Sequence, residues 1–250
     1  NLKVTDDAMR EIINEYTMES GVRGLKKQME TLCRQAAVKL VKGEQKSISV
    51  GVKRLKEFLG RKKIHHDVRM QEPQAGVVTG LAWTSAGGEI LFIETSRTKG
   101  EGKVQITGQL GDVMKESVQI ALTLVKSMFP EEAETLNESD IHIHVPAGAV
   151  PKDGPSAGIT IVTALTSMLK EKGISPEYAM TGEVSLRGGV MPIGGLPEKL
   201  MAAQRAGIRT VFIPYENRED LEDVADEVKE DLTIIPVKRI EEVLQKTNLI

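Results

Sequence analysis

The sequence predicts an α+β fold (mixed α/β) for most of the chain, preceded by a small all-α module. The main observation is a change of character at Val77, where helical periodicity gives way to short β-branched runs broken by glycines. Beyond it, strands cluster early and then alternate with helices. The composition is 40% hydrophobic and 28% charged with only 3% aromatic residues, which is typical of a globular protein with an aliphatic core.

The first module is expected to be helical because its apolar residues recur at helical spacing. Thr5 is a candidate N-cap for the first helix. The second helix has a long apolar stripe, and Cys33, the only cysteine, lies on it and is expected to pack there. One cysteine excludes an internal disulfide, in keeping with a reducing, cytoplasmic location. The predicted elements are helices over 5–16, 25–41 and 52–59, a strand over 46–50, a module end at 69 and a linker over 70–76.

The second module, residues 77–250, carries strand and helix patterns in turn. The segment 112–128 is amphipathic, and 157–169 is apolar on nearly all sides, as in a buried helix. Residues 179–195 form a β stretch punctuated by glycines. The other predicted strands cover 77–84, 89–96, 102–108, 140–145, 210–214 and 232–237, and the other helices cover 196–206, an acidic segment before the last strand, and the C-terminus.

Charge is distributed unevenly between the modules. Residues 1–69 hold 16 Lys and Arg against 9 Asp and Glu, whereas the remainder holds 17 against 27. A basic module can face the phosphates of a nucleotide or nucleic acid, although a solvated helical surface explains the excess equally well. No apolar stretch is long enough to predict a membrane span. The chain begins with Asn rather than Met, so we expect it to be a piece of a longer protein.

Ser156 in "PKDGPSAG" is a candidate nucleophile because it stands on a stiff turn before an apolar helix. A serine hydroxyl needs a base to remove its proton. Histidine is the usual base, but G-x-S-x-G is absent, and His142 and His144 alternate in a predicted strand as structural residues would. No third residue stands at a spacing that would complete a metal site with the two histidines. The metal-binding motifs H-E-x-x-H and C-x-x-C are also absent from the sequence. No metal site is predicted.

Lysine is the other known base for serine, provided that burial lowers its pKa. Lys199 in "GGLPEKLMAAQRAG" falls on the apolar face of a predicted helix, whereas Lys152 lies in a polar loop. Spacing therefore favours a dyad of Ser156 and Lys199. The alternative is a capping serine and a surface lysine whose charged end reaches water.

Long, specific motifs extend this interpretation. The segments "PKDGPSAG", "MTGEVSLRGGVMPIGGLPEKLMAA" and "TGLAWTSAGGEILFIET" closely resemble the proteolytic domain of the bacterial type of ATP-dependent Lon protease. "EYTMESGVRGLKKQME" resembles the end of that family's AAA+ ATPase module, the helical lid. The resemblance covers essentially the whole chain. It implies that Ser156 is the nucleophile and Lys199 its base.

The resemblance also implies roles for further residues. The threonine that hydrogen-bonds the lysine falls on Thr181, and the lid arginine that senses nucleotide phosphates falls on Arg23. Pro197, Gln204 and Met18 depart from the usual family pattern, but none of them is a member of the dyad. Supporting positions around the site fall on Glu94, His142, His144 and Asp153.

The family implies a cytoplasmic homohexamer that degrades unfolded, damaged and regulatory proteins in quality control and stress response, with ATP and Mg²⁺ as cofactors. It also implies DNA binding as a second activity, with which the basic residues 1–69 are compatible. This chain has no G-x-x-x-x-G-K-[ST] phosphate loop, so we expect no cofactor in it, no ATP hydrolysis and no unfolding of substrates. Two alternatives are a non-catalytic ring-forming or DNA-binding module and an ATP-independent Ser-Lys peptidase. The intact Ser156, Thr181 and Lys199 argue against the first.

Overall fold

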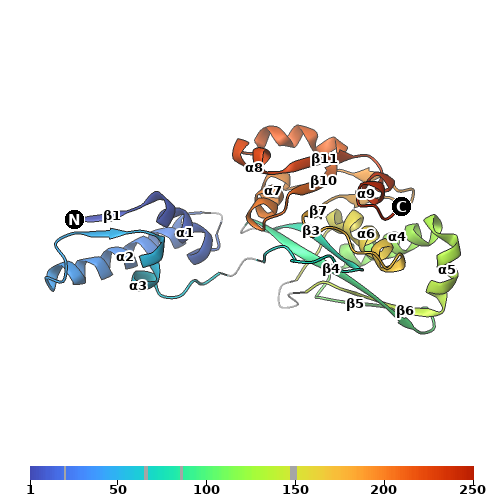
Figure 1. The fold of residues 1–250 in the computed structure, drawn as a ribbon, viewed down its shortest axis with the longest axis horizontal. Coiled ribbons are helices and arrows are strands. Elements are labelled where there is room, and N and C mark those ends of the chain that lie inside the picture. The colour runs from blue at the N-terminus through green and yellow to red at the C-terminus, as the bar shows by residue number, and fades with distance from the viewer. Residues whose placement is uncertain (20, 65–66, 85–86, 147–150) are drawn as a thin grey trace. The chain divides into compact units, whose positions relative to one another are not determined.

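The computed structural model describes residues 1–19, 21–64, 67–84, 87–146 and 151–250. The chain divides into two compact units, one formed by described residues up to 64 and the other by 67–84 and 88–250 (Figure 1). None of the described helices is long and apolar enough to cross a membrane. Each unit has a hydrophobic core of its own.

The first unit is a helical module with one small sheet in addition. Its helices follow the predicted apolar periodicity, and the Thr5 side chain accepts a hydrogen bond from the amide of Ala8, as an N-cap does. The predicted strand finds a parallel partner in residues 2–4, which the sequence pattern did not indicate. The elements are β1 (Leu2–Val4), α1 (Asp6–Tyr16), α2 (Arg23–Val41), β2 (Ile48–Val50), a 3₁₀ turn (Val52–Arg54) and α3 (Leu55–Leu59).

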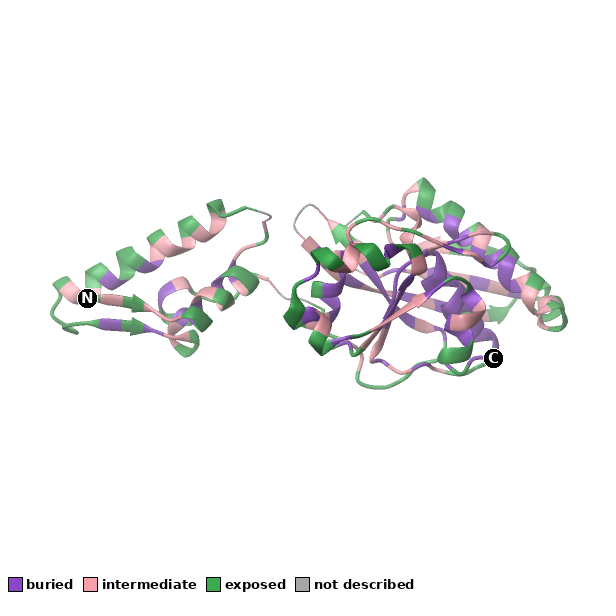
Figure 2. Cartoon of the chain, turned by 90° about the horizontal axis from the view of Figure 1, so that it is seen from above, coloured by how far each residue is buried: buried purple, intermediate pink, exposed green. Residues whose placement is uncertain are grey.

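The prediction for Cys33 was wrong. Leu32 and Ala36 of α2 are buried against α1 and α3, but Cys33 is exposed. One residue further along a helix is a turn of about 100°, so a helix that packs on only one side leaves that position in water. The packed stripe of α2 is therefore narrower than its apolar sequence, and Figure 2 shows most of this long helix as exposed or half-buried.

The second unit is built on a mixed sheet of seven strands, in the order β11-β10-β7-β3-β4-β6-β5. The strands β11, β10, β7 and β3 are parallel neighbours, and β6 is antiparallel to β4 and parallel to β5. This is the mixed fold class that the sequence predicts. The strands are β3 (Val77–Thr84), β4 (Gly87–Lys99), β5 (Val104–Thr107), β6 (Ser139–His144), β7 (Tyr178–Met180), β8 (Glu183–Val184), β9 (Val190–Met191), β10 (Thr210–Pro214) and β11 (Thr233–Val237), of which β8 and β9 form a separate hairpin.

Helices cover both faces of this sheet. One core cluster joins α4, α6 and α9 to the sheet, and a second joins α7 and α8 to it. All twelve residues of α6 are buried, which agrees with its nearly all-apolar sequence, and Figure 2 shows the centre of this unit as buried. The helices are α4 (Asp112–Met128), α5 (Pro130–Asn137), α6 (Gly158–Leu169), α7 (Leu196–Arg205), α8 (Asp226–Asp231) and α9 (Ile240–Lys246), with 3₁₀ segments at Pro155–Ala157 and Tyr215–Asp223.

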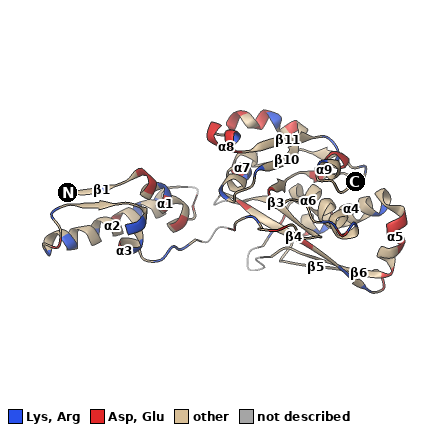
Figure 3. Ribbon diagram, viewed as in Figure 1, with Lys and Arg blue, Asp and Glu red and all other residues tan. Residues whose placement is uncertain are grey.

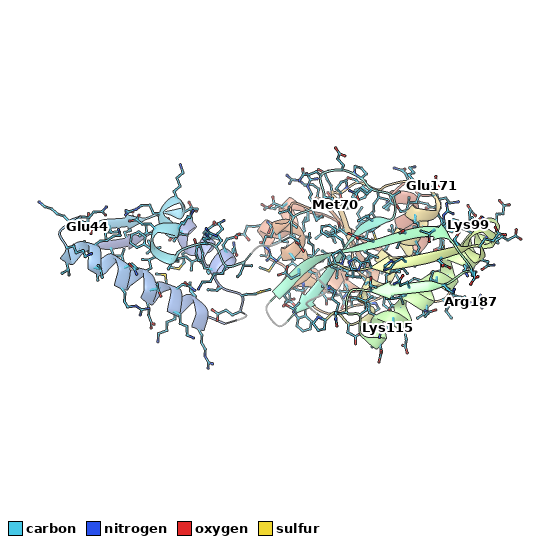
Figure 4. All side chains as sticks on the ribbon, turned by 90° about the horizontal axis from the view of Figure 1, so that it is seen from below. Glu44, Met70, Lys99, Lys115, Glu171 and Arg187 are labelled. Atoms are coloured by element: carbon cyan, nitrogen blue, oxygen red, sulfur yellow. The ribbon has the colours of Figure 1, made fainter. Side chains whose placement is uncertain are left out.

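Apart from the buried Lys199, the described charged side chains lie at the periphery of the second unit. Figure 3 shows acidic residues along α8 and the segment before it, where an acidic helix was predicted and where the structure has a 3₁₀ segment followed by α8. Ion pairs in this unit join exposed or half-buried groups, as between Lys115 and Asp112 and between Arg97 and Glu171. Lys115 and Glu171 point outward in Figure 4. Exposed pairs of this kind contribute at most about 1 kcal/mol each, so the apolar core dominates stability.

Candidate active site

Ser156 stands in the 3₁₀ turn that leads into α6. Gly154 precedes it at φ 120°, a conformation open to glycine, and Pro155 fixes the next residue. The side chain of Ser156 is half-buried, whereas α6 directly behind it is fully buried. The backbone carbonyl of Ser156 accepts hydrogen bonds from the amide of Gly182 at 2.8 Å and from the hydroxyl of Thr181 at 3.3 Å. The turn is thus attached to the segment that follows β7.

Lys199 lies in the first turn and a half of α7, on the side that packs onto the sheet. Its side chain is 2% exposed, between the buried Leu196 and Leu200. The Lys199 ammonium donates to the Thr181 hydroxyl at 3.2 Å. Burial lowers the pKa of Lys199 from 10.5 to about 8, because desolvation disfavours the charged form. A lysine of this kind is partly neutral near pH 8.

Thr181 connects the two candidates. It follows β7, is completely buried, and bonds to both Ser156 and Lys199. A hydroxyl has one proton, which Thr181 gives to the Ser156 carbonyl, so toward Lys199 it acts as an acceptor. The lysine lone pair is therefore not used by Thr181. The structure thus brings together Ser156, Thr181 and Lys199 from segments up to 43 residues apart in the chain.

Asp153 lies on the same loop as Ser156, and its carboxylate bonds both to α4 and to the next residue of the loop. Its carboxylate accepts from the amides of Met114 at 3.0 Å and Gly154 at 2.9 Å. Met114 is the third residue of α4, which has no cap from its own N-cap residue Gly111. Asp153 therefore caps this helix from a distant loop, as an acidic group at a helix N-terminus does.

Glu94 on β4 and His142 and His144 on β6 form a separate cluster with Thr107 on β5. The Thr107 hydroxyl lies 2.8 Å from Nε2 of His142 and 2.7 Å from Nδ1 of His144. Glu94 is paired opposite His144 across β4 and β6. Within the described ranges, neither histidine hydrogen-bonds to Ser156 or Lys199, and no group of three or more His, Cys, Asp or Glu is placed to hold a metal ion.

The N-terminal part of α7 is held by close contacts from β3 and β4. A Cβ atom on Gly88 would lie 1.9 Å from the carbonyl oxygen of Glu198, and one on Gly195 would meet the ring of Trp83 at 2.7 Å. Arg205 at the end of α7 donates to the carbonyl of Gly88 at 2.7 Å. Gly195 also has a positive φ of 68°, so two separate reasons favour glycine there. These contacts fix the helix that carries Lys199.

Some residues that shape the site were not among the sequence candidates. Gly182 and Thr107 belong to this group, and so does Asn217, whose side chain brackets the loop before α7. Gly182 lies within the "MTGEV" part of a family motif, so the sequence could have indicated that it belongs to the site. Thr107 and Asn217 occur in ordinary strand and turn contexts and have no local signature. Arg23, the predicted nucleotide sensor, is exposed at the start of α2 in the other unit.

Comparison with known proteins defines first the class and then the family. Residues 49–249 match the family model described as Lon protease (S16) C-terminal proteolytic domain, which makes this part of the chain a peptidase domain. Residues 1–48 match the Lon protease AAA+ ATPase lid domain. The chain belongs to the Lon protease family.

Relatives support the same assignment. The chain is 55% identical over 247 residues to Lon protease of Clostridium beijerinckii, 51% over 248 residues to Lon protease of Methanosarcina barkeri, and 49% over 248 residues to Lon protease 1 of Bacillus subtilis. Each comparison covers 98% of this chain but only 31% or 32% of the relative. The chain therefore spans about a third of the length of these relatives.

Proposed function

We propose that this chain is the proteolytic part of an ATP-dependent serine endopeptidase that uses Ser156 as nucleophile and Lys199 as base. The observation that carries the proposal is the buried Lys199 amine, with its lowered pKa and its connection through Thr181 to the turn of Ser156. A base is most effective when its pKa lies near the working pH. Lys152 is a poorer candidate because it is less deeply buried.

The proposed reaction is acyl transfer in two steps. The Ser156 oxygen attacks the peptide carbonyl while its proton passes to the neutral Lys199 amine, and Lys199 then protonates the leaving amine as the C–N bond breaks. Water, deprotonated by Lys199, hydrolyses the resulting ester and regenerates both groups. Backbone amides around Ser156 are expected to stabilise the oxyanion. The amide of Ile159 is not one of them, because it already donates to the carbonyl of Gly182 at 3.0 Å.

Asp153, Glu94, His142 and His144 have supporting roles in this proposal. Asp153 holds the loop of Ser156 against the start of α4 through the Met114 amide. The two histidines share the Thr107 hydroxyl and thereby tie β6 to β5 at the edge of the sheet. These contacts support the frame of the site, and none of them is made to Lys199 or to the Ser156 hydroxyl.

In the whole protein we further propose ATP and Mg²⁺ as cofactors, a homohexamer, a cytoplasmic location, and unfolded, damaged and regulatory proteins as substrates in quality control and the stress response. The printed chain lacks a phosphate loop, and Arg23 alone cannot hold a nucleotide, so its residues do not fit ATP and we derive no step through it. DNA binding by residues 1–69 is a second candidate, favoured by their 16 basic against 9 acidic residues.

Hydrolysis of a short fluorogenic peptide tests the main proposal. We expect slow hydrolysis that rises with pH around an apparent pKa near 8. Ser156→Ala and Lys199→Arg should be inactive yet folded, because an arginine stays charged. Lys152→Arg, the matched control, should keep its activity. Normal turnover by Lys199→Arg removes lysine from the mechanism, and an inactive wild-type chain favours a non-catalytic module.

A further inference from the structure

Asn217 is a buried polar side chain in the 3₁₀ segment that follows β10. It is 4% exposed, and its amide forms a bracket around one residue of the loop before α7. The Asn217 oxygen accepts from the amide of Ile193 at 3.0 Å, and its nitrogen donates to the carbonyl of Ile193 at 2.8 Å. The same nitrogen donates to the carboxylate of Asp220 at 2.6 Å. All hydrogen-bonding groups of this amide have partners.

The bracketed residue lies just upstream of the lysine helix. Ile193 is followed by two glycines, and α7 then begins at Leu196. Gly195, the N-cap residue, provides no side-chain cap. The two glycines and the missing cap leave Pro197 as the local restraint at the start of α7, so contacts from elsewhere help to set where its first turn lies. Lys199 is in that part of the helix.

We propose that Asn217 is a positioning residue for Lys199: through its two bonds to Ile193 it fixes the start of α7 and keeps the lysine amine buried beside Thr181. The inference rests on the proposed role of Lys199 as base. Lys199 has one described hydrogen bond, at 3.2 Å, so little besides the helix position keeps its amine in place. If the loop at Ile193 relaxes, the amine gains water and its proton affinity returns toward that of an ordinary lysine.

Only an amide in a fixed orientation can form this bracket. A carboxylate has no donor for the Ile193 carbonyl, and an aliphatic side chain leaves both backbone groups unpaired. Asp220 accepts only, so it holds the nitrogen of Asn217 on its own side and the oxygen toward the Ile193 amide. Asp220 therefore reinforces the orientation of the Asn217 amide that the Ile193 amide and carbonyl require.

Charged groups near α7 do not account for the lowered pKa of Lys199. Burial is the one cause of the lowered pKa of Lys199 that the described residues provide. The titratable groups on the elements packed against α7, and those of α7 other than Lys199, are Glu89, Glu94, Arg97, Lys99, Glu198, Arg205, Tyr215, Glu216, Arg218, Glu219, Asp220, Glu222, Asp223, Asp226, Glu227, Lys229, Glu230 and Asp231.

The experiment measures the titration of Lys199 directly. The 250-residue chain is labelled with ¹³C and ¹⁵N at lysine, and the Lys199 resonance is identified by its loss in Lys199→Arg. We expect it to titrate near pH 8 in the wild type. In Asn217→Ala the midpoint should rise by at least about one pH unit, and peptide hydrolysis at pH 8 should fall at least about fivefold through kcat rather than KM.

Two further variants keep the test decisive. Asp220→Ala leaves both bonds to Ile193 possible but removes the third partner of the Asn217 amide, so it should fold and shift the titration in the same direction by less. Ser167→Ala is the control: it removes two hydrogen bonds at the far end of α6, a buried one from the amide of Gly76 and a partly buried one to the carbonyl of Lys172. It should lower the thermal transition and leave the titration of Lys199 unchanged.

The outcomes separate this inference from the proposed function. A folded Asn217→Ala whose Lys199 titrates as in the wild type overturns the inference, as does an unchanged titration in Asp220→Ala if Asn217→Ala does not fold. A shift in Ser167→Ala equal to that in Asn217→Ala overturns it as well. Failure of the wild type to cleave peptides, with the titration near pH 8 and its shift intact, refutes the peptidase proposal and leaves the role of Asn217 supported.

Discussion

Replacing Lys199 with methionine should abolish activity and stabilise the fold at neutral pH. The unfolded chain holds this lysine at its ordinary pKa of 10.5, whereas the folded chain holds it at about 8. One pKa unit corresponds to about 1.4 kcal/mol, so at pH 7 burial of the ammonium costs roughly 3 kcal/mol. Methionine fills a similar volume without a charge, and its thioether adapts to the apolar site. We therefore expect Lys199→Met to be more stable by up to roughly 3 kcal/mol at pH 7.

The difference in stability between the wild type and Lys199→Met should depend on pH in a specific way. The folded pKa lies below the unfolded one, so the unfolded state binds more protons between pH 8 and 10.5, and wild-type stability relative to Lys199→Met rises with pH in that window. The advantage of the variant should shrink by about 1.4 kcal/mol per pH unit there and be constant below it.

Urea unfolding of both proteins from pH 7 to 10.5 measures this difference, and other titrating groups cancel because the two chains share them. A gap that does not change with pH, or a variant less stable than the wild type at pH 7, would refute the reasoning.

Other predictions concern the frame of the site and the limits of this chain. Gly88→Ala should destabilise the second unit by about 1–3 kcal/mol in urea unfolding, because the new methyl group would lie 1.9 Å from the carbonyl oxygen of Glu198; unchanged stability would contradict this close approach. Asp153→Ala should cost about 1 kcal/mol by uncapping α4 at Met114, and a loss of peptide hydrolysis without that loss of stability would instead assign Asp153 to the chemistry. ATP with Mg²⁺ should leave peptide hydrolysis unchanged in a fluorogenic assay, and stimulated degradation of a stably folded protein would contradict the expectation drawn from the missing phosphate loop.

Local sequence patterns predicted the elements near the site well. The helix predicted over 112–128 has those bounds in the structure, and the one predicted over 196–206 differs by one residue. Both have clear apolar faces, and a periodic face is strong evidence when it packs against a sheet. The same reasoning singled out Lys199 as a buried lysine, which the structure confirms. Its role as a base stays a prediction.

Contacts between residues far apart in the chain could not be predicted from local sequence patterns. Nothing local indicates that residues 2–4 pair with 48–50, or that Asp153 caps a helix that begins about 40 residues earlier. Cys33 was misplaced because an apolar neighbour in sequence is not a packed neighbour when a helix buries only one narrow stripe. Asn217 occurs in a charged stretch, and only the folded chain brings it to Ile193.

The complete burial of α6 has a consequence for how this domain loses function on heating. Amides in a helix with no solvent-exposed side chain exchange with solvent mainly when the whole unit opens, whereas those at exposed ends exchange by local fraying. Ser156, the proposed nucleophile, is joined to the first turn of this helix, so we expect it to be carried by one of the slowest-exchanging parts of the chain. Deuterium uptake by α6 and thermal loss of peptidase activity should therefore follow the same transition, and the turn of Ser156 should be among the last places at which the domain's own peptide bonds become accessible to cleavage.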